Sequence, residues 1–181
     1  MLSLKSDLVI KVLGYYFLNP KSRHYVRELA ELLKVDPGNL SKKMSELKKE
    51  GLFLMESEGK NRYFVLNENF PLLQEYKNIY EEKFGVVESL KLAIKDIAGL
   101  NEAYIFGSYV KGNFEEGSDI DLLVIGNHDH LKISRAISVL EKRWHREINI
   151  VDFSKDEFTK KMKDKDFFLN NIFSGKTIKI V

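Results

Sequence analysis

Apolar residues in the first third of the chain recur at every third or fourth position in three segments, and this spacing predicts three helices. The expected helices span residues 3–18, 26–33 and 37–50. Asp36 followed by Pro37 supplies the third helix with an N-cap and a favourable first residue, and Gly51 ends it.

Two strand-like runs follow, at 52–58 and 62–66, and flank the turn Gly59-Lys60-Asn61. Short strand-like runs on either side of such a turn indicate a β-hairpin. The segment 67–71 then interrupts the hydrophobic pattern with Asn and Pro, so we expect the first domain to end there.

The rest of the chain begins with a long helical pattern. Apolar residues recur every three or four positions from Tyr76 to Ile97, which predicts one helix that Gly85 can break. We then expect strands at 102–106, 119–125, 147–153 and 177–181, and helices at 129–143 and 154–171. Strands alternating with helices predict a small sheet covered by helices.

Two acids lie at the start of the second of these strands. Asp119 and Asp121 alternate with Ile120 and Leu122, so the two carboxylates point to the same face of the strand. Adjacent carboxylates repel, and a divalent cation between them removes that cost; carboxylates together with phosphate oxygens are ligands that Mg²⁺ prefers. The Gly107-Ser108 turn before them offers backbone N–H groups to a phosphate.

The motifs GSYVKG at 107–112 and SDIDLLV at 118–124 resemble the nucleotidyltransferase superfamily related to DNA polymerase beta, particularly its minimal members. The resemblance implies that an NTP and Mg²⁺ (or Mn²⁺) bind here and that Asp119 and Asp121 are the metal-binding and catalytic residues. The nucleotide-binding candidates are Gly107, Ser108, Lys111 and Ser118. For Lys111, an ordinary surface lysine is an equally good interpretation.

Members of this superfamily usually supply a third acid from a later strand, and the matching position here is Asn149. An Asn carbonyl oxygen can complete a metal's coordination, but it neither neutralises the metal nor acts as a base. Glu147 lies two residues earlier on the same face and would replace Asn149 only if the strand were shifted. Asp152 points to the opposite face and is a poor substitute. The metal ligands we expect are therefore Asp119, Asp121 and Asn149.

Three helices followed by a two-stranded ribbon are the order of a winged helix-turn-helix domain. The runs VRELAELL at 26–33 and NLSKKMSELKKEGL at 39–52 resemble transcriptional regulators of the ArsR/MarR type. The resemblance implies binding of double-stranded DNA, with the third helix in the major groove. The DNA-binding candidates are Asn39, Ser41, Lys42, Ser45, Lys49, Lys60 and Arg62. The alternative is a winged helix that contacts protein.

The fold class we predict is α+β with two domains. A winged helix-turn-helix domain at 1–70 precedes a linker helix at 71–99, and a nucleotidyltransferase α/β domain with a small mixed sheet occupies 100–181. The linker helix either offers a surface for a homodimer, since winged-helix regulators usually bind two half-sites as dimers, or simply packs on the second domain, and the sequence favours neither.

Composition adds little to this picture. Residues 1–70 hold 12 Lys and Arg against 9 Asp and Glu, which fits phosphate contacts only weakly. Cysteine is absent, so neither disulfides nor thiolate metal sites are available. The sequence has no signal peptide or membrane span, which favours the cytoplasm. His128 and His130 could suggest a metal clamp, but the sequence shows no third partner, and an ordinary loop is the favoured interpretation.

Three functions fit these observations. The first is a DNA-binding protein that binds NTP and Mg²⁺ and transfers a nucleoside monophosphate to a hydroxyl acceptor. The second is a transcriptional regulator whose nucleotidyltransferase domain senses a nucleotide without turnover. The third is a module that binds a partner protein, as minimal nucleotidyltransferases of toxin–antitoxin pairs do.

Overall fold

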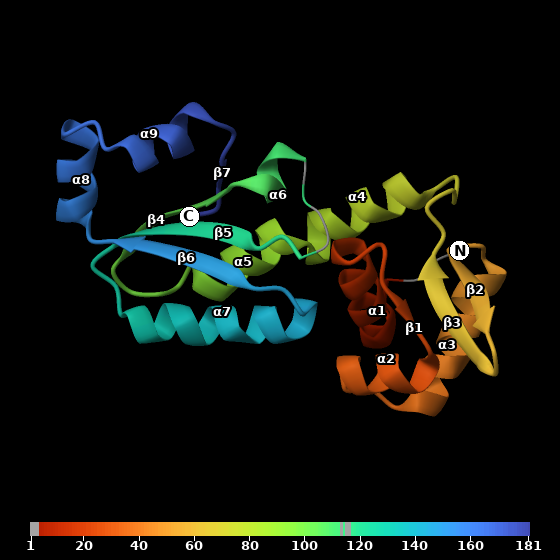
Figure 1. Ribbon diagram of the computed structural model, residues 1–181. Coiled ribbons are helices and arrows are strands. Elements are labelled where there is room, and N and C mark those ends of the chain that lie inside the picture. Colours follow the sequence, from red (N-terminus) through yellow and green to blue (C-terminus); the bar gives the residue numbers. More distant parts are fainter. Residues whose placement is uncertain (1–3, 113, 115–116) are drawn as a thin grey trace. The chain divides into compact units, whose positions relative to one another are not determined.

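Residues up to Phe84 form the first of two units in the computed structural model, which describes residues 4–112, 114 and 117–181. Its elements are α1 (Asp7–Leu18), β1 (Arg23–His24), α2 (Val26–Leu33), α3 (Pro37–Lys49), β2 (Phe53–Glu58), β3 (Asn61–Leu66) and α4 (Leu73–Phe84). The three strands form an antiparallel sheet in the order β1-β3-β2. Figure 1 shows α2 and α3 joined by a short turn and followed by the β2–β3 hairpin.

The predicted start of α3 is confirmed in detail. Asp36 Oδ1 accepts a hydrogen bond from the backbone N–H of Asn39 at 2.8 Å, and Pro37 is the first helical residue. Lys34, in the left-handed conformation with φ of 52°, ends α2 and turns the chain toward α3. Leu40, Met44 and Leu47 are buried, so α3 packs its apolar face into the core of this unit.

Strand β1 has no counterpart among the predicted elements. It contains only Arg23 and His24, which pair with Val65 and Phe64 of β3. Two residues are too short for a period-2 pattern, so this strand forms because β3 offers it a free edge.

The second unit begins at Gly85 and contains a four-stranded sheet. Its elements are α5 (Val86–Ile94), β4 (Leu100–Phe106), α6 (Ser108–Lys111), β5 (Ile120–Gly126), α7 (His130–Trp144), β6 (Ile148–Phe153), α8 (Lys155–Lys163), α9 (Phe167–Ser174) and β7 (Ile178–Lys179). The strand order is β6-β5-β4-β7, with β5 and β6 parallel and the other pairs antiparallel, so the predicted mixed sheet is present.

Strand β5 lies inside this sheet and is covered on both faces. Figure 1 shows α5 and α7 on one face and α8 and α9 on the other. Leu123 and Ile125 pack with Leu169 and Ile172 of α9, while Leu122 and Val124, which point the opposite way, are also fully buried. Asp119 and Asp121 lie four and two residues before Leu123, so strand alternation points them toward the same face, the one that α9 covers.

Two predicted helices are each divided in the structure. The expected linker helix at 71–99 is two helices, α4 and α5, because Gly85 has an extended ψ of −177° and ends the first helix; the boundary between the two units falls at the same point. The expected helix at 154–171 is also two, since Lys165 adopts a φ of 54° and Asp166 caps a new helix by accepting from the N–H of Leu169.

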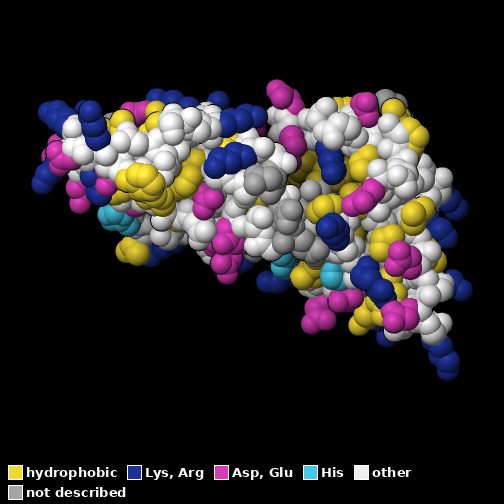
Figure 2. Space-filling view, turned by 45° about the horizontal axis from the view of Figure 1, so that its top comes forward, with side chains coloured by type: hydrophobic (Ala, Val, Ile, Leu, Met, Phe, Trp, Pro, Cys, Tyr) yellow, Lys and Arg dark blue, Asp and Glu magenta, His cyan; other side chains and the backbone are white. Residues whose placement is uncertain are grey.

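Charges of both signs are interspersed over the surface. On the face drawn in Figure 2, Lys and Arg side chains lie among Asp and Glu side chains and hydrophobic groups. Within the described ranges, none of the helices combines the length and the apolar character that crossing a membrane requires.

Candidate functional site

Asp119 and Asp121 lie at the amino-terminal end of β5, on the face of the sheet that α9 covers. Phe106, the last residue of β4, pairs with Asp121 of β5. The Gly107-Ser108 turn follows Phe106 directly and therefore begins beside Asp121. The antiparallel pairing of β4 and β5 thus places the Gly-Ser turn beside the acids, although 10 residues separate Ser108 from Ser118 in sequence.

Asn149 joins this pair from β6. The parallel register sets Asn149 beside Asp121, and its side-chain Nδ2 donates to Asp119 Oδ2 at 3.2 Å and to Asp121 Oδ1 at 3.5 Å. The amide nitrogen is the atom that faces the carboxylates. Rotation of the amide by half a turn would instead present its carbonyl oxygen, which is the atom that a metal requires.

Gly107 makes the tightest approach to the acids. Its φ of 78° and ψ of −151° lie in a region that is essentially restricted to glycine. A Cβ atom placed on Gly107 would lie 3.0 Å from Cγ of Asp121 and closer still to its Oδ2. Glycine is therefore required here both by the backbone conformation and by the Asp121 carboxylate.

The environment of Asp121 works against a negative charge. Burial raises the pKa of this carboxyl above its ordinary range, and the neighbouring charge of Asp119 raises it further. The Asn149 hydrogen bond and the positive charge of Lys111 act in the opposite direction. The net direction is upward, with burial as its largest cause, so the charged form of Asp121 is disfavoured here and a nearby divalent cation would favour it.

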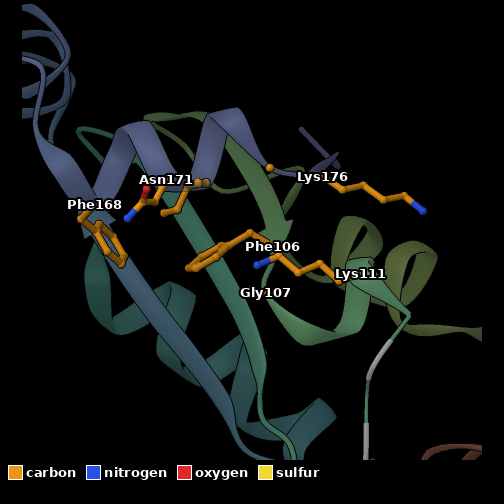
Figure 3. A pocket seen from close by; sticks show the side chains of 8 residues that line it. Phe106, Gly107, Lys111, Phe168, Asn171 and Lys176 are labelled. Atoms are coloured by element: carbon orange, nitrogen blue, oxygen red, sulfur yellow. The ribbon is translucent and has the colours of Figure 1, made fainter.

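A cavity of about 210 Å³ opens beside the Gly-Ser turn. It is lined by Phe106, Gly107, Lys111, Phe168, Asn171, Ile172, Gly175 and Lys176. Figure 3 shows the rings of Phe106 and Phe168 on the same side of the cavity, with the Lys111 side chain running toward Phe106 and Lys176 extending away. The cavity combines aromatic surface with one inward cation, which suits a planar group and a phosphate.

Other predicted residues of this site fall around its edge. Ser108 is the first residue of α6, and Ser118 immediately precedes Asp119. Glu147 precedes β6; its backbone carbonyl accepts from the N–H of Ile120, and its exposed side chain lines a hollow of about 440 Å³ that Arg146 and Asn149 also line. Asn149 is thus the β6 residue whose side chain contacts both acids.

Arg146 is a site residue that the sequence pattern does not indicate. It is only 6% exposed, its Nη1 donates to the backbone carbonyl of Ser118 at 3.3 Å, and its guanidinium lies 5.2 Å from the centre of the Phe114 ring. Arg146 thus holds the residue that leads into Asp119. The only available signal was a charged residue beside a predicted strand, which is too common to be informative.

The seven DNA-binding candidates all have exposed side chains in the first unit. Asn39, Ser41, Lys42, Ser45 and Lys49 lie on α3, Lys60 lies in the turn between β2 and β3, and Arg62 lies on β3. The Ser45 hydroxyl donates to the Ser41 carbonyl at 2.8 Å, so it has only acceptor capacity left for another group.

Comparison with known proteins agrees with the class of the second unit. The sequence profile described as "Nucleotidyltransferase domain" matches residues 87–177. No curated protein sequence matches the chain. Among solved structures, a toxin–antitoxin complex with AMP-PNP aligns at 19% identity and a TM-score of 0.39, covering 52% of this chain and 72% of that one.

Two further structures align over similar lengths. A mutant of the toxin–antitoxin pair MntA-HpeT has 17% identity and a TM-score of 0.39, covering 53% of this chain and 73% of that chain. A protein from Sulfolobus solfataricus described as a nucleotidyltransferase has 21% identity and a TM-score of 0.28, covering 41% and 71%.

A mixed sheet that brings a Gly-Ser turn and an Asp-x-Asp pair together defines the class as a nucleotide-handling α/β domain. The profile match spans half of the chain, and the chain therefore belongs to the nucleotidyltransferase domain family.

Proposed function

We propose that the second unit binds a nucleoside triphosphate together with Mg²⁺ or Mn²⁺ and transfers the nucleoside monophosphate to a hydroxyl acceptor. The observation that carries the proposal is the convergence of Gly107, Asp121 and Asn149. These three residues come from separate segments and meet at one point beside a cavity.

The donor groups suit a divalent cation. Two carboxylates point to one face, Asn149 offers an amide next to both, and burial, the largest cause, raises the pKa of Asp121 and so disfavours its charge unless a cation binds. Asp119, Asp121 and the Asn149 carbonyl oxygen would hold the ion. When bound, the ion would neutralise the carboxylates and the phosphate oxygens of the nucleotide.

The protein's own residues then position the reactants. Gly107 and Ser108 lie where the triphosphate would run, and Lys111 supplies a positive charge from the cavity wall. The acceptor oxygen forms a bond to the α-phosphorus, the bond from that phosphorus to the β-phosphate oxygen breaks, pyrophosphate leaves, and the hydroxyl proton is released. Asn149 cannot accept that proton, so we expect slow turnover compared with a site that has three acids.

Incubation with labelled ATP, CTP, GTP or UTP and Mg²⁺ tests this function. We expect label on the protein or on an added acceptor, and we expect Asp119→Asn and Asp121→Asn to remove it. Glu147→Gln is the discriminating variant: unchanged activity supports Asn149 as the third ligand, whereas loss of activity would assign that role to Glu147.

Calorimetry with a non-hydrolysable ATP analogue separates transfer from binding. Acid-dependent binding without labelled product would favour a nucleotide sensor over an enzyme. Absence of both binding and transfer, with the fold intact by circular dichroism, would contradict the proposal.

A second function is supported by the first unit. We infer that α1, α2, α3 and the β2–β3 hairpin form a winged helix-turn-helix that binds double-stranded DNA, on the basis of their order and the exposed polar face of α3. In this proposal, the exposed side chains of Lys42 and Lys49 on α3 and of Arg62 on the hairpin would contact phosphates.

A mobility-shift assay on the DNA upstream of the protein's own gene tests this inference. Lys42→Ala and Arg62→Ala should each weaken binding and reduce its salt dependence by about one counterion. Lys43→Ala is the matched control, because Lys43 neighbours Lys42 but forms an ion pair with Glu46 on the same helix. If all three variants weaken DNA binding equally, or if none weakens it, a protein-binding module is favoured instead, with a second copy or a toxin-type partner as its ligand.

A further inference from the structure

Two histidines and an aspartate converge at the end of the sheet opposite to the acid pair. His128 follows β5, His130 is the first residue of α7, and Asp152 lies near the end of β6. Asp152 Oδ2 lies 3.0 Å from His128 Nε2 and 2.6 Å from His130 Nδ1. Asp152 is therefore the third partner of the two histidines, which the sequence alone did not reveal.

The topology explains why the pattern was not visible in the sequence. β5 and β6 are parallel, so their carboxyl ends meet at the same edge, and Asp152 pairs with Val124 near the end of β5. Asp152 is three residues from Asn149, which is about 10 Å along the strand and on the opposite face. The cluster therefore lies apart from the Asp119–Asp121 pair.

The ligand atoms are close enough to share one ion. The His128, His130 and Asp152 ligand atoms all lie within 4.8 Å of one another. Metal–ligand bonds of about 2.0–2.1 Å in a tetrahedron place the ligand atoms about 3.4 Å apart. The separation from Asp152 Oδ2, now 3.0 Å for His128 and 2.6 Å for His130, would increase by about 0.4 Å and about 0.8 Å, and side-chain rotation allows the larger change at the 74% exposed His130.

The surroundings favour a cation at this point. The His128 side chain is 0% exposed and that of Asp152 18%, and the second carboxylate oxygen of Asp152, Oδ1, is buried with no hydrogen-bond partner among the described residues. Both imidazoles are directed at Oδ2 alone, so hydrogen bonding leaves half of a largely buried carboxylate unsatisfied. An ion bound by Oδ2, or by both oxygens, would balance that charge.

Glu157 lies nearby, but its carboxylate accepts hydrogen bonds from Ser154. The hydroxyl and backbone N–H of Ser154 hold the pKa of this carboxyl below its ordinary range, with a smaller contribution from His130. Because Glu157 completes the capping box of α8, its carboxylate is not counted as a ligand in this cluster.

We propose that His128, His130 and Asp152 bind one divalent transition-metal ion of the Zn²⁺ type. Imidazole nitrogen with a carboxylate oxygen suits Zn²⁺, Co²⁺ or Ni²⁺, whereas Mg²⁺ prefers oxygen ligands alone. The ion ties the end of β5, the start of α7 and the end of β6 together, so its binding stabilises the fold of this unit.

The test is a titration of the full chain, treated with chelator and then dialysed, with ZnCl₂ by calorimetry and with CoCl₂ by visible absorption. We expect one ion per chain, a Co²⁺ spectrum of tetrahedral or five-coordinate type, and a higher Tm with Zn²⁺. His130→Ala should weaken Zn²⁺ binding at least tenfold. This variant should fold normally because His130 is exposed.

Two controls locate the ion. His145→Asn changes the exposed histidine at the other end of α7, where Asn tolerates the left-handed conformation with φ of 51°, and should leave binding unchanged. The double variant Asp119→Asn/Asp121→Asn should also retain the Zn²⁺ ion, which separates this proposal from the nucleotide site. Binding that survives His130→Ala but is lost in the double variant would overturn the proposal, as would no binding at about 1 mM metal.

Discussion

Gly107 is packed so closely against Asp121 that the space for its missing side chain is occupied by the Asp121 carboxylate. Gly107 directly follows the last residue of β4, and Asp121 belongs to β5, the strand that pairs with β4. The contact fixes the distance between the backbone of the turn, where phosphates are proposed to bind, and the carboxylate proposed to bind the metal. Phosphate and metal positions are therefore set by one packing contact.

Gly107→Ala should damage both positions at once. The added Cβ requires Asp121 to move and forces Ala into a φ and ψ that only glycine adopts readily, at a cost of about 1–3 kcal/mol. We expect the affinity for Mg²⁺ and an ATP analogue to fall by at least tenfold, measured by calorimetry, and the Tm to decrease.

Gly112→Ala is the matched control for this change. Gly112 also has a positive φ, 80°, but apart from its chain neighbours no atom of the described residues lies within 4 Å of the position of its Cβ. Its ψ of 11° places it near the left-handed helical region, where Ala is tolerated at a smaller cost. An equal loss of affinity in the two variants would show that backbone strain, and not the approach to Asp121, is responsible.

Asn149→Asp should strengthen metal binding. The substitution replaces an amide that donates to Asp119 and Asp121 with a third carboxylate, which repels them unless a cation is present. We expect a lower Tm without metal, a larger rise in Tm on adding Mn²⁺ than the natural protein shows, and faster transfer. Asn149→Ala removes the donor without adding a charge. If Ala and Asp have the same effect on the metal response, Asn149 does not face the ion.

The pKa of Asp121 predicts how stability depends on pH. Because burial, followed by Asp119, raises this pKa in the folded protein above its unfolded value, the folded state binds more protons between the two values. The contribution to stability is present below the unfolded pKa and is lost as pH rises through the folded pKa. Asp121→Asn removes the ionisable group, so it should abolish this loss of stability at high pH. We expect a higher Tm at neutral pH, by about 2–4 °C for each kcal/mol of unfolding free energy regained.

Thermal unfolding from pH 4 to 7, with and without Mg²⁺ and an ATP analogue, measures this effect. The natural protein should regain stability when the ligands are added, and Asp121→Asn should not. If Asp121→Asn is less stable than the natural protein at pH 7 without metal, Asp121 affects stability through its hydrogen bond with Asn149 and not through its charge.

The acid pair could be located from sequence because strand alternation is a local property. Asp119 and Asp121 are two residues apart on an apolar strand, so their common face follows from the period alone, and the contacts of Asn149 with both confirm it. The third helix was equally predictable, since its Asp36 cap and Pro37 start are encoded by adjacent residues.

Features that depend on the register between distant strands could not be predicted. The approach of Asp152 to His128 follows from the parallel pairing of β5 with β6, which no local pattern specifies. The break between α8 and α9 rests on a left-handed Lys165, a residue type that gives no turn signal. Arg146 was missed because its importance comes from burial beneath Ser118.

Arg146 provides the last prediction, because it positions Asp119 without belonging to the acid pair. Its guanidinium holds the carbonyl of Ser118, the residue before Asp119. Arg146→Met keeps most of the buried volume but removes the charged donor to the Ser118 carbonyl, at a cost of about 1.5–3 kcal/mol for the lost hydrogen bond. We expect affinity for the metal–nucleotide complex to fall about tenfold, since small displacements of ligands have large effects.

Arg146→Lys should recover part of the affinity, because a lysine retains one donor and the charge but not the planar geometry. Arg135→Met, at an exposed arginine of α7, is the control and should change neither stability nor affinity. A loss of stability in Arg146→Met with unchanged metal–nucleotide affinity would mean that Arg146 supports the fold alone. A loss of affinity that Lys partly restores would establish that the Ser118 carbonyl must be held for Asp119 to reach the ion.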